Sequence, residues 1–311
     1  MENKIKIFYS KDWPSDLVGK QDYEMLDTGN GEKLERFGHY TFIRPYESAF
    51  WGKTLSEKEW GKADGKFWSS KIDTKNKLPS LKKSVGGWKM KNDIKEKWVM
   101  SYKGVKFHAF PTPFRHLEFF PEQASHWDFI EEKIKNAKRP IKFLNLFGYT
   151  GVASLFALKG GGDVTHLDAS KQTLSLVKEN QKLSGMEEFP MRIILDDAVK
   201  FIEREIKRGN KYDCVIMDPP KFGRGPKGEI WKIEENLPEL LSKIRKILSD
   251  KPLFVILTSY AIEASSLSLG YALEETMKGL KGKVEAGELC ILEKSNNRTI
   301  PLANTAIWSV E

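Results

Sequence analysis

Residues 142–151 read Lys-Phe-Leu-Asn-Leu-Phe-Gly-Tyr-Thr-Gly, and this stretch decides the fold. The apolar run from Phe143 to Phe147 predicts a buried strand, and Gly148 and Gly151 allow the following turn to pass close to a ligand. Helical sequence continues from Val152 to Lys159. A strand, a glycine-containing turn and a helix in this order open the nucleotide-binding crevices of doubly wound α/β sheets.

Strand-like and helix-like segments alternate regularly from residue 142 to the end of the chain, which predicts an α/β domain with a parallel sheet. Before them, Pro121 and Glu122 mark the start of a connector helix over about 121–138, because proline is favoured in the first turn. The expected strands are 142–147, 163–168, 191–195, 212–217, 253–259, 285–293 and 304–310, and the expected helices are 151–160, 170–184, 198–208, 232–248 and 263–280.

Carboxylates end or follow the second, third and fourth of these strands, at the edge where parallel strands deliver ligand-binding residues, and the third strand is followed by Asp196 and Asp197. Asp168 ends the second strand and is placed to accept hydrogen bonds from a ribose diol, although it could instead cap the helix that begins near Ser170. Asp218 ends the fourth strand and opens the run Asp218-Pro-Pro-Lys-Phe222. Two prolines fix the backbone direction there, and they remove amide donors, which leaves local carbonyls able to accept.

Together, the turn 145–151, Asp168 and Asp218-Pro-Pro resemble the class I S-adenosylmethionine (SAM) methyltransferases. The turn departs from the dinucleotide fingerprint G-x-G-x-x-G, and SAM has no pyrophosphate that would need one. A NAD-linked enzyme is a distant alternative. The resemblance implies a Rossmann-like seven-stranded sheet with an antiparallel last strand, SAM as cofactor and S-adenosylhomocysteine as product.

The resemblance also implies roles for individual residues of the site. Asp168 would bind the ribose hydroxyls, and either Asp196 or Asp197 would accept the amine of adenine while the other caps a helix; we favour Asp197 for adenine because it directly precedes Ala198. Gln123 would touch the cofactor. The turn that wraps the methionine part of SAM would comprise Asn145, Phe147, Gly148, Tyr149, Thr150 and Gly151.

The reaction side would be formed by the motif Asp218, Pro219, Pro220, Lys221 and Phe222, our candidates for catalysis. In nucleic-acid methyltransferases this turn faces the methyl group, its acid and a carbonyl hold the target amine, and an aromatic ring stacks on a base. The usual amine-methylating pattern places the aromatic directly after Pro-Pro, whereas Lys221 intervenes here. Residues 221–228 read as a flexible basic loop that either contacts phosphate, closes over substrate or is simply solvated.

Within the family, residues 118–311 resemble the bacterial methyltransferases of 23S, or large-subunit, ribosomal RNA, which include cytosine-C5 and guanine-N7 enzymes. Cytosine-C5 methylation needs a cysteine thiolate. Cys214 and Cys290 both lie inside strand-like segments, so we predict direct transfer to a nitrogen or oxygen of RNA, with Asp218 as the candidate base. The alternatives are a methyltransferase of protein or small molecules and a non-catalytic RNA-binding protein that retains SAM.

Charge divides the chain unevenly. Residues 1–115 contain 23 Lys and Arg against 15 Asp and Glu, together with six of the nine tryptophans, whereas residues 116–311 have no net charge. We therefore expect a small basic β-rich domain over 1–115 and a methyltransferase domain over 116–311. Basic residues among aromatics suit RNA binding, but a solvated lysine-rich surface over a tryptophan core explains them equally well.

Smaller features of the N-terminal third predict strands at Tyr40–Arg44, Trp98–Tyr102 and Val105–Phe110, a tight turn at Asp27–Gly31, and a long loop or irregular insertion over Lys53–Gly87. The sequence has no apolar run of bilayer length and no signal-peptide pattern, and its two cysteines indicate neither a disulfide framework nor a metal site. We therefore expect a cytoplasmic protein with no membrane and no metal partner.

Overall fold

The computed structural model describes residues 5–13, 22–69, 86–91, 94, 96–260 and 264–310. The chain forms two compact units: unit 1 comprises Met1–Ser10, Glu122–Cys290 and Pro301–Glu311, and unit 2 comprises Lys11–Pro121 and Ile291–Ile300. These units differ from the division at residue 115 that composition suggested. Met1–Ser10 belongs to unit 1, because Lys6–Phe8 pairs with Gly287–Leu289 of that unit. Ile291–Ile300, in the C-terminal part of the chain, belongs to unit 2.

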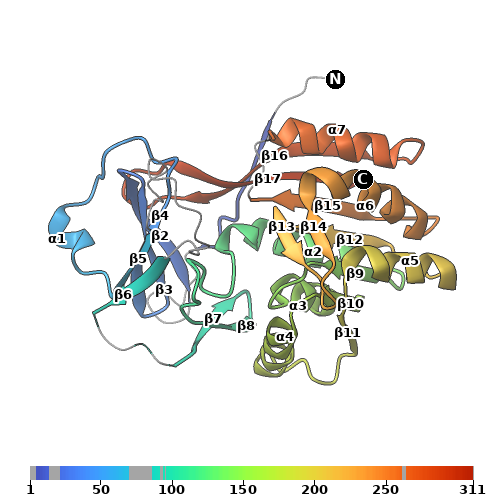
Figure 1. Ribbon diagram of the computed structural model, residues 1–311, viewed down its shortest axis with the longest axis horizontal. Helices are drawn as coiled ribbons and strands as arrows, with labels where there is room; N and C mark the ends of the chain where they lie inside the picture. Colours follow the sequence, from blue (N-terminus) through green and yellow to red (C-terminus); the bar gives the residue numbers. More distant parts are fainter. Residues whose placement is uncertain are drawn as a thin grey trace. The chain divides into compact units, whose positions relative to one another are not determined.

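Unit 1 is built on one eight-stranded sheet with the order β1-β16-β17-β15-β12-β9-β10-β11 (Figure 1). The strands from β15 to β11 are parallel, β17 runs antiparallel to β15, and β1 pairs in parallel with β16. The expected seven strands are confirmed, and β1 is an eighth that the sequence did not reveal. The strands are β1 Lys6–Phe8, β9 Lys142–Leu146, β10 Asp163–Asp168, β11 Met191–Leu195, β12 Cys214–Met217, β15 Phe254–Ser259, β16 Lys283–Leu292 and β17 Thr299–Ser309.

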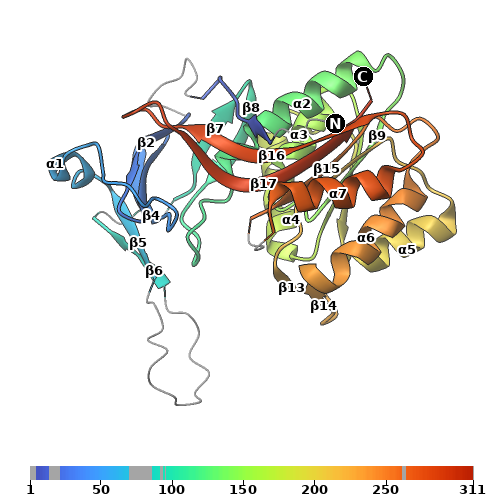
Figure 2. The same ribbon diagram turned by 90° about the horizontal axis from the view of Figure 1, so that it is seen from above.

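Helices cover both faces of this sheet. Figure 2 shows α5, α6 and α7 on one face and α2 and α3 on the other, and α4 packs beside α3. All the expected helices are present with ends shifted by a few residues. They are α2 Ala124–Asn136, α3 Val152–Lys159, α4 Lys171–Leu183, α5 Ala198–Arg208, α6 Ile233–Ile247 and α7 Ser266–Met277, and the connector helix begins with a short 3-10 turn, η1 Pro121–Gln123.

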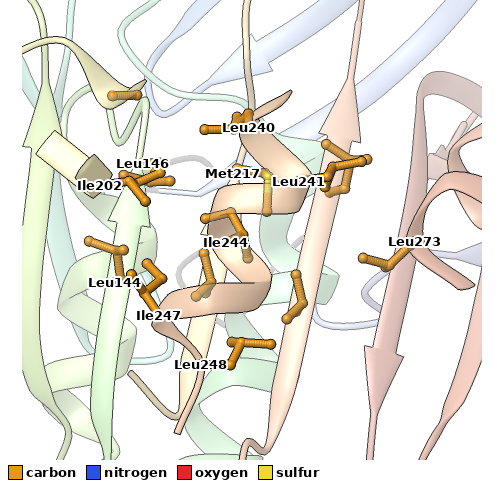
Figure 3. Packing of buried hydrophobic residues seen from close by; sticks show 14 of the residues in the cluster. Leu144, Leu146, Ile202, Met217, Leu240, Leu241, Ile244, Ile247, Leu248 and Leu273 are labelled. Carbon is orange, nitrogen blue, oxygen red and sulfur yellow. The ribbon is translucent and has the colours of Figure 1, made fainter. Parts of the chain in front are cut away.

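The core of unit 1 follows from the two-residue period of its strands. Leu144 and Leu146 of β9 point into the cluster formed with α5, α6 and α7, where the apolar side of α6 packs down onto the sheet (Figure 3). The alternate residues Phe143 and Asn145 face the opposite side, and all four are buried. This alternation is what turns the side chain of Asn145 toward α3.

A short hairpin follows the Asp-Pro-Pro motif, formed by β13 Phe222–Arg224 and β14 Ile230–Lys232. Its turn is Gly225-Pro-Lys-Gly228, closed by a hydrogen bond from the Gly228 amide to the Gly225 carbonyl, with Gly228 at φ 87°. Proline at the second turn position and a left-handed glycine are what such a turn requires. The expectation of a flexible loop over 221–228 is therefore wrong.

Unit 2 contains a five-stranded sheet, β2-β3-β4-β5-β6, and a separate pair, β7-β8. The predicted strands near 40–44, 98–102 and 105–110 and the turn near 27–31 are confirmed. Lys53–Gly87 was predicted as a loop, but it includes one helical turn and a strand pair, while residues 70–85 lie outside the described residues. The elements are β2 Tyr23–Gly29, β3 Glu32–Phe37, β4 Tyr40–Pro45, α1 Glu57–Trp60, β5 Gly65–Ser69, β6 Gly86–Met90, β7 Trp98–Tyr102 and β8 Val105–Ala109.

Tryptophans of the N-terminal third serve mainly as core. Trp13, Trp60 and Trp98 are buried, and the Trp60 indole donates to Asp27 at 2.8 Å, whereas Trp68 is 45% exposed. Most of this aromatic content therefore stabilises unit 2 and is not displayed for stacking. In the described part of the chain, no helix combines the length and apolar character that crossing a membrane would require.

Candidate active site

The turn after β9 has an unusual backbone. Phe147 and Tyr149 adopt φ of 57° and 50°, and Gly151 adopts 85°. The amide of Gly148 donates to Leu167 in the next strand at 2.9 Å. Left-handed conformations at residues other than glycine cost of order 1–3 kcal/mol and concentrate at ligand sites, where the surrounding structure holds them.

Beneath the turn lies a buried polar chain that the sequence reasoning missed. The Asn145 amide donates to the Ser154 hydroxyl at 3.0 Å, and this hydroxyl lies 2.9 Å from Nδ1 of His166. Burial lowers the pKa of His166 to about 4, so its ring is neutral. A Cβ on Gly148 would lie 2.3 Å from Cε1 of this ring. Asn145 and His166 therefore support the turn from below. In the sequence, the one indication of this role for His166 is that a polar residue stands in the middle of a buried strand.

The end of the turn is fastened to α4. The Asn180 amide donates to the Thr150 carbonyl at 3.0 Å, and Thr150 is itself buried. A Cβ on Gly151 would lie 2.9 Å from Cγ1 of Val177. Both glycines of the turn are thus also required by close packing.

Asp168 ends β10 and is half-buried. Its Oδ2 accepts from the Tyr149 amide at 2.9 Å, and its Oδ1 accepts from the Ser170 amide at 2.8 Å and the Thr173 hydroxyl at 3.1 Å. Burial raises the pKa of Asp168, and these hydrogen bonds counteract it. Ser170 caps α4, as its position suggested, so Asp168 remains the strand-end carboxylate of the turn.

The two acids after β11 have different partners. Asp197 is the cap of α5, because its Oδ1 accepts from the Lys200 amide at 3.0 Å. Asp196 accepts from the Asp197 amide at 2.9 Å and forms an ion pair with Arg204. The capping role therefore falls on the residue that we had favoured for adenine, whereas both carboxylate oxygens of Asp196 already have a partner, one the Asp197 amide and the other Arg204.

On the reaction side, Asp218 is joined to two residues distant in sequence. Nε2 of Gln123 donates to Oδ2 of Asp218 at 3.2 Å and to the hydroxyl of Tyr260 at 3.1 Å. Burial and the nearby Glu122 raise the pKa of Asp218 well above its usual value. A carboxyl tuned in this way can exchange a proton nearer neutral pH than an ordinary aspartate can.

His126 fixes the orientation of this amide. Its Nδ1 lies 2.9 Å from Oε1 of Gln123, and its Nε2 lies 3.2 Å from the Thr305 hydroxyl. Because the Gln123 nitrogen donates to Asp218 and Tyr260, its oxygen can only accept, so Nδ1 of His126 carries the proton. Burial lowers the pKa of His126 to about 3, which keeps the ring neutral. Gln123, expected to contact the cofactor, therefore positions Asp218 in this structure.

Of the remaining residues of the motif, some hold the hairpin in place and others are exposed to solvent. The Pro220 carbonyl accepts from the indole of Trp231 at 2.7 Å, so one of its two acceptor positions is already used within the protein. The same indole packs 5.1 Å from the Phe147 ring. Pro219 is buried, while Lys221 and Phe222 are exposed. Trp231, which the sequence reasoning did not single out, thus ties the hairpin to both the motif and the turn.

Neither cysteine is arranged as a nucleophile. Both are free and buried, and burial raises the pKa of Cys214 well above its usual value and that of Cys290 to about 12. Reactive cysteines are instead accessible and have a lowered pKa.

Comparison with known proteins places this geometry in context. A family model described as "Conserved hypothetical protein 95" matches residues 124–255. The chain is similar to the SAM-dependent methyltransferase from Agrobacterium tumefaciens, whose crystal structure is known. The two sequences are 41% identical, and the structures superpose with a TM-score of 0.87 over 98% of this chain and 94% of that one. A putative methyltransferase, SMU.776, complexed with SAH, shares the fold at 17% identity, with a TM-score of 0.67 over 89% of this chain and 71% of that one.

A similarity to a curated RNA enzyme is more local. The chain is 36% identical over 91 residues to the ribosomal RNA large subunit methyltransferase I of Aeromonas salmonicida (strain A449). This match covers 29% of the chain and only 22% of that relative's length.

Proposed function

Because the chain belongs to the SAM-dependent methyltransferases, we propose that it transfers the methyl group of SAM directly to a nitrogen or oxygen of RNA, and specifically of ribosomal RNA. The observation that carries the choice of atom is the pairing of two inert, buried cysteines with a raised-pKa carboxyl, Asp218, at the reaction side. The name of the Aeromonas relative and the basic N-terminal third support RNA as the substrate.

The residues around the β9 turn fit SAM. The left-handed backbone at Phe147 and Tyr149 and the half-buried carboxylate of Asp168 at the adjacent strand end suit a ligand with a ribose and an amino-acid tail. We assign the ribose to Asp168, and the adenine amine to the Asp196–Asp197 pair. The pair as a whole stays the candidate, because Asp197 caps α5 through Oδ1 and Asp196 is held by the Asp197 amide and Arg204. SAM supplies a sulfonium-activated methyl group.

Direct transfer requires in-line positioning of the acceptor and exclusion of water more than acid–base chemistry. Asp218 would accept a proton where the acceptor atom carries one, and Gln123 would hold its carboxyl in place. Phe222, which is 54% exposed, would contact the target base. No covalent intermediate with the protein is involved, since the thiols of the chain are buried.

The test combines SAM labelled in its methyl group with ribosomal RNA from a strain that lacks the gene. Nucleosides from the digested RNA are then identified by mass spectrometry. We expect an N- or O-methylated nucleoside, undiminished by Cys214→Ala and abolished by Asp218→Ala, with SAM binding retained in both variants. A 5-methylcytosine product lost in Cys214→Ala would overturn the choice of atom. Labelling of protein or of a small molecule, with none in RNA, would overturn the choice of substrate.

A further inference from the structure

Two carboxyls come together at the carboxyl end of β12. Glu122 lies in η1 and is only 5% exposed, and Asp218 follows β12 and is half-buried. Burial and the charge of Glu122 raise the pKa of Asp218 well above its usual value, so the two groups are close enough to repel each other when both are ionised. No lysine or arginine in the described part of the chain offsets this repulsion at Asp218.

Tyr260 distinguishes the two carboxyls. It lies one residue beyond β15, the strand next to β12. Its hydroxyl donates to Glu122 and accepts from Nε2 of Gln123, which also donates to Asp218. His126 of α2 is neutral and reaches the pair only through Gln123. Because a hydroxyl donor stabilises a carboxylate, Glu122 holds the negative charge and Asp218 holds the exchangeable proton.

The pair lies beside the turn that we assign to the cofactor. β9 and β12 are neighbouring parallel strands, with Leu146 beside Met217. The next residues along them, Phe147 and Asp218, therefore follow the sheet at the same level, on strands about 4.8 Å apart. Phe147 opens the left-handed turn proposed for the amino-acid tail of SAM. In SAM this tail is joined to a positively charged sulfonium, whereas in S-adenosylhomocysteine (SAH) the same atom is an uncharged thioether.

We propose that Glu122 and Asp218 form an anionic pair that recognises the sulfonium charge and so selects SAM over SAH. The inference rests on the placement of SAM at the β9 turn in the proposed function and is independent of the RNA substrate. A cation beside two carboxyls favours the doubly ionised pair, so Asp218 releases its proton when the cofactor binds. The ionised Asp218 that the proposed function uses as a base is thereby formed on cofactor binding. Because SAH lacks the positive charge, Asp218 keeps its proton when SAH binds.

Calorimetric titration of the full chain with SAM and with SAH measures both affinities and the protons released. It is carried out on both sides of neutral pH and in buffers of different ionisation enthalpy. We expect SAM to release more protons than SAH, and the preference for SAM to rise with pH as the free Asp218 ionises. Each unit by which the sulfonium lowers the pKa of Asp218 corresponds to about a tenfold rise of this preference between acid and alkaline pH.

Glu122→Gln keeps the size of the side chain and removes one of the two charges. It should reduce the preference for SAM roughly tenfold, the effect of about one pKa unit, and should reduce the extra proton release. Asp163→Asn is the matched control, because it removes an exposed carboxylate from the amino end of β10, at the opposite edge of the sheet. The control should behave as the wild type does. Comparison between proteins cancels the ionisation of the ligands themselves.

Two results would overturn the inference. One is equal proton release by SAM and SAH in the wild type, with a preference that does not change with pH; this measurement needs no variant. The other is a folded Glu122→Gln protein that keeps the preference and the pH dependence of the wild type. In both cases RNA methylation still decides the proposed function separately. If the wild type binds neither SAM nor SAH, the placement of the cofactor is wrong and the inference fails with it.

Discussion

Replacement of Gln123 by leucine removes the amide that connects three buried or half-buried groups at the reaction side. Its nitrogen donates to Asp218 and Tyr260, and its oxygen accepts from His126. Leucine fills a similar volume and forms no hydrogen bonds. The substitution therefore separates the contribution of hydrogen bonding from that of packing.

The expected loss of stability follows from the burial of each partner. His126 is fully buried, and its protonated Nδ1 would lose its acceptor, at a cost of about 1–3 kcal/mol. Asp218 and Tyr260 are only half-buried, so water can replace part of what each loses, and each lost hydrogen bond contributes about 0.5–1.5 kcal/mol. We expect Gln123→Leu to reduce the free energy of unfolding by about 2–4 kcal/mol.

The same change should affect catalysis, because a donor to Asp218 favours the ionised carboxylate. Without it, the pKa of Asp218 should rise further, so the acid limb of the pH–rate profile should move to higher pH. Urea unfolding and the pH dependence of kcat measure the two effects. Gln181→Leu is the matched control, since its amide donates to the carbonyls of Met186 and Phe189 near the surface. A stability loss no greater than that of Gln181→Leu, with an unmoved acid limb, would refute the reasoning.

Two further predictions concern stability at other points of the site. Burial and Glu122 raise the pKa of Asp218, so its stabilising contribution is complete below the unfolded pKa of about 3.9 and is lost as pH rises through the folded value. In the absence of SAM, the melting temperature of Asp218→Asn should therefore be above that of the wild type at alkaline pH. The difference in melting temperature should shrink toward acid pH, and a difference that stays constant would contradict this. Gly148→Ala should destabilise the protein by about 1–3 kcal/mol and weaken SAM binding, because its Cβ would meet the His166 ring. Gly52→Ala, whose Cβ meets nothing within 4 Å, is the control in thermal denaturation and SAM titration.

Local patterns were sufficient for most of unit 1. Apolar runs and helical periodicity predicted every strand from β9 onward except the short β13 and β14, and they predicted helices α2 to α7. The order of the turn after β9, Asp168 and Asp218-Pro-Pro indicated the family and its cofactor. Such features depend on residues close together in sequence, and parallel strands then bring their ends to one edge of the sheet.

Short elements were missed because their stability comes from partners elsewhere. β1 has three residues and exists through pairing with β16, which follows it by more than 270 residues in the chain. The β13–β14 hairpin was predicted as a flexible loop from its glycines and lysines. Trp231 is what anchors it, through contacts with Pro220 and Phe147 that no local pattern could reveal.

The sequence by itself determined the α/β fold, the family and the strand ends at which chemistry takes place, since periodicity and motif order are local properties of the chain. Only the tertiary structure decided how the side chains at those ends are used. Gln123 meets Asp218 across 95 residues and Tyr260 across 137, and Asp197 proved to be a helix cap. Hydrogen-bond partners and pKa values depend on burial and on distances between residues that only folding brings together.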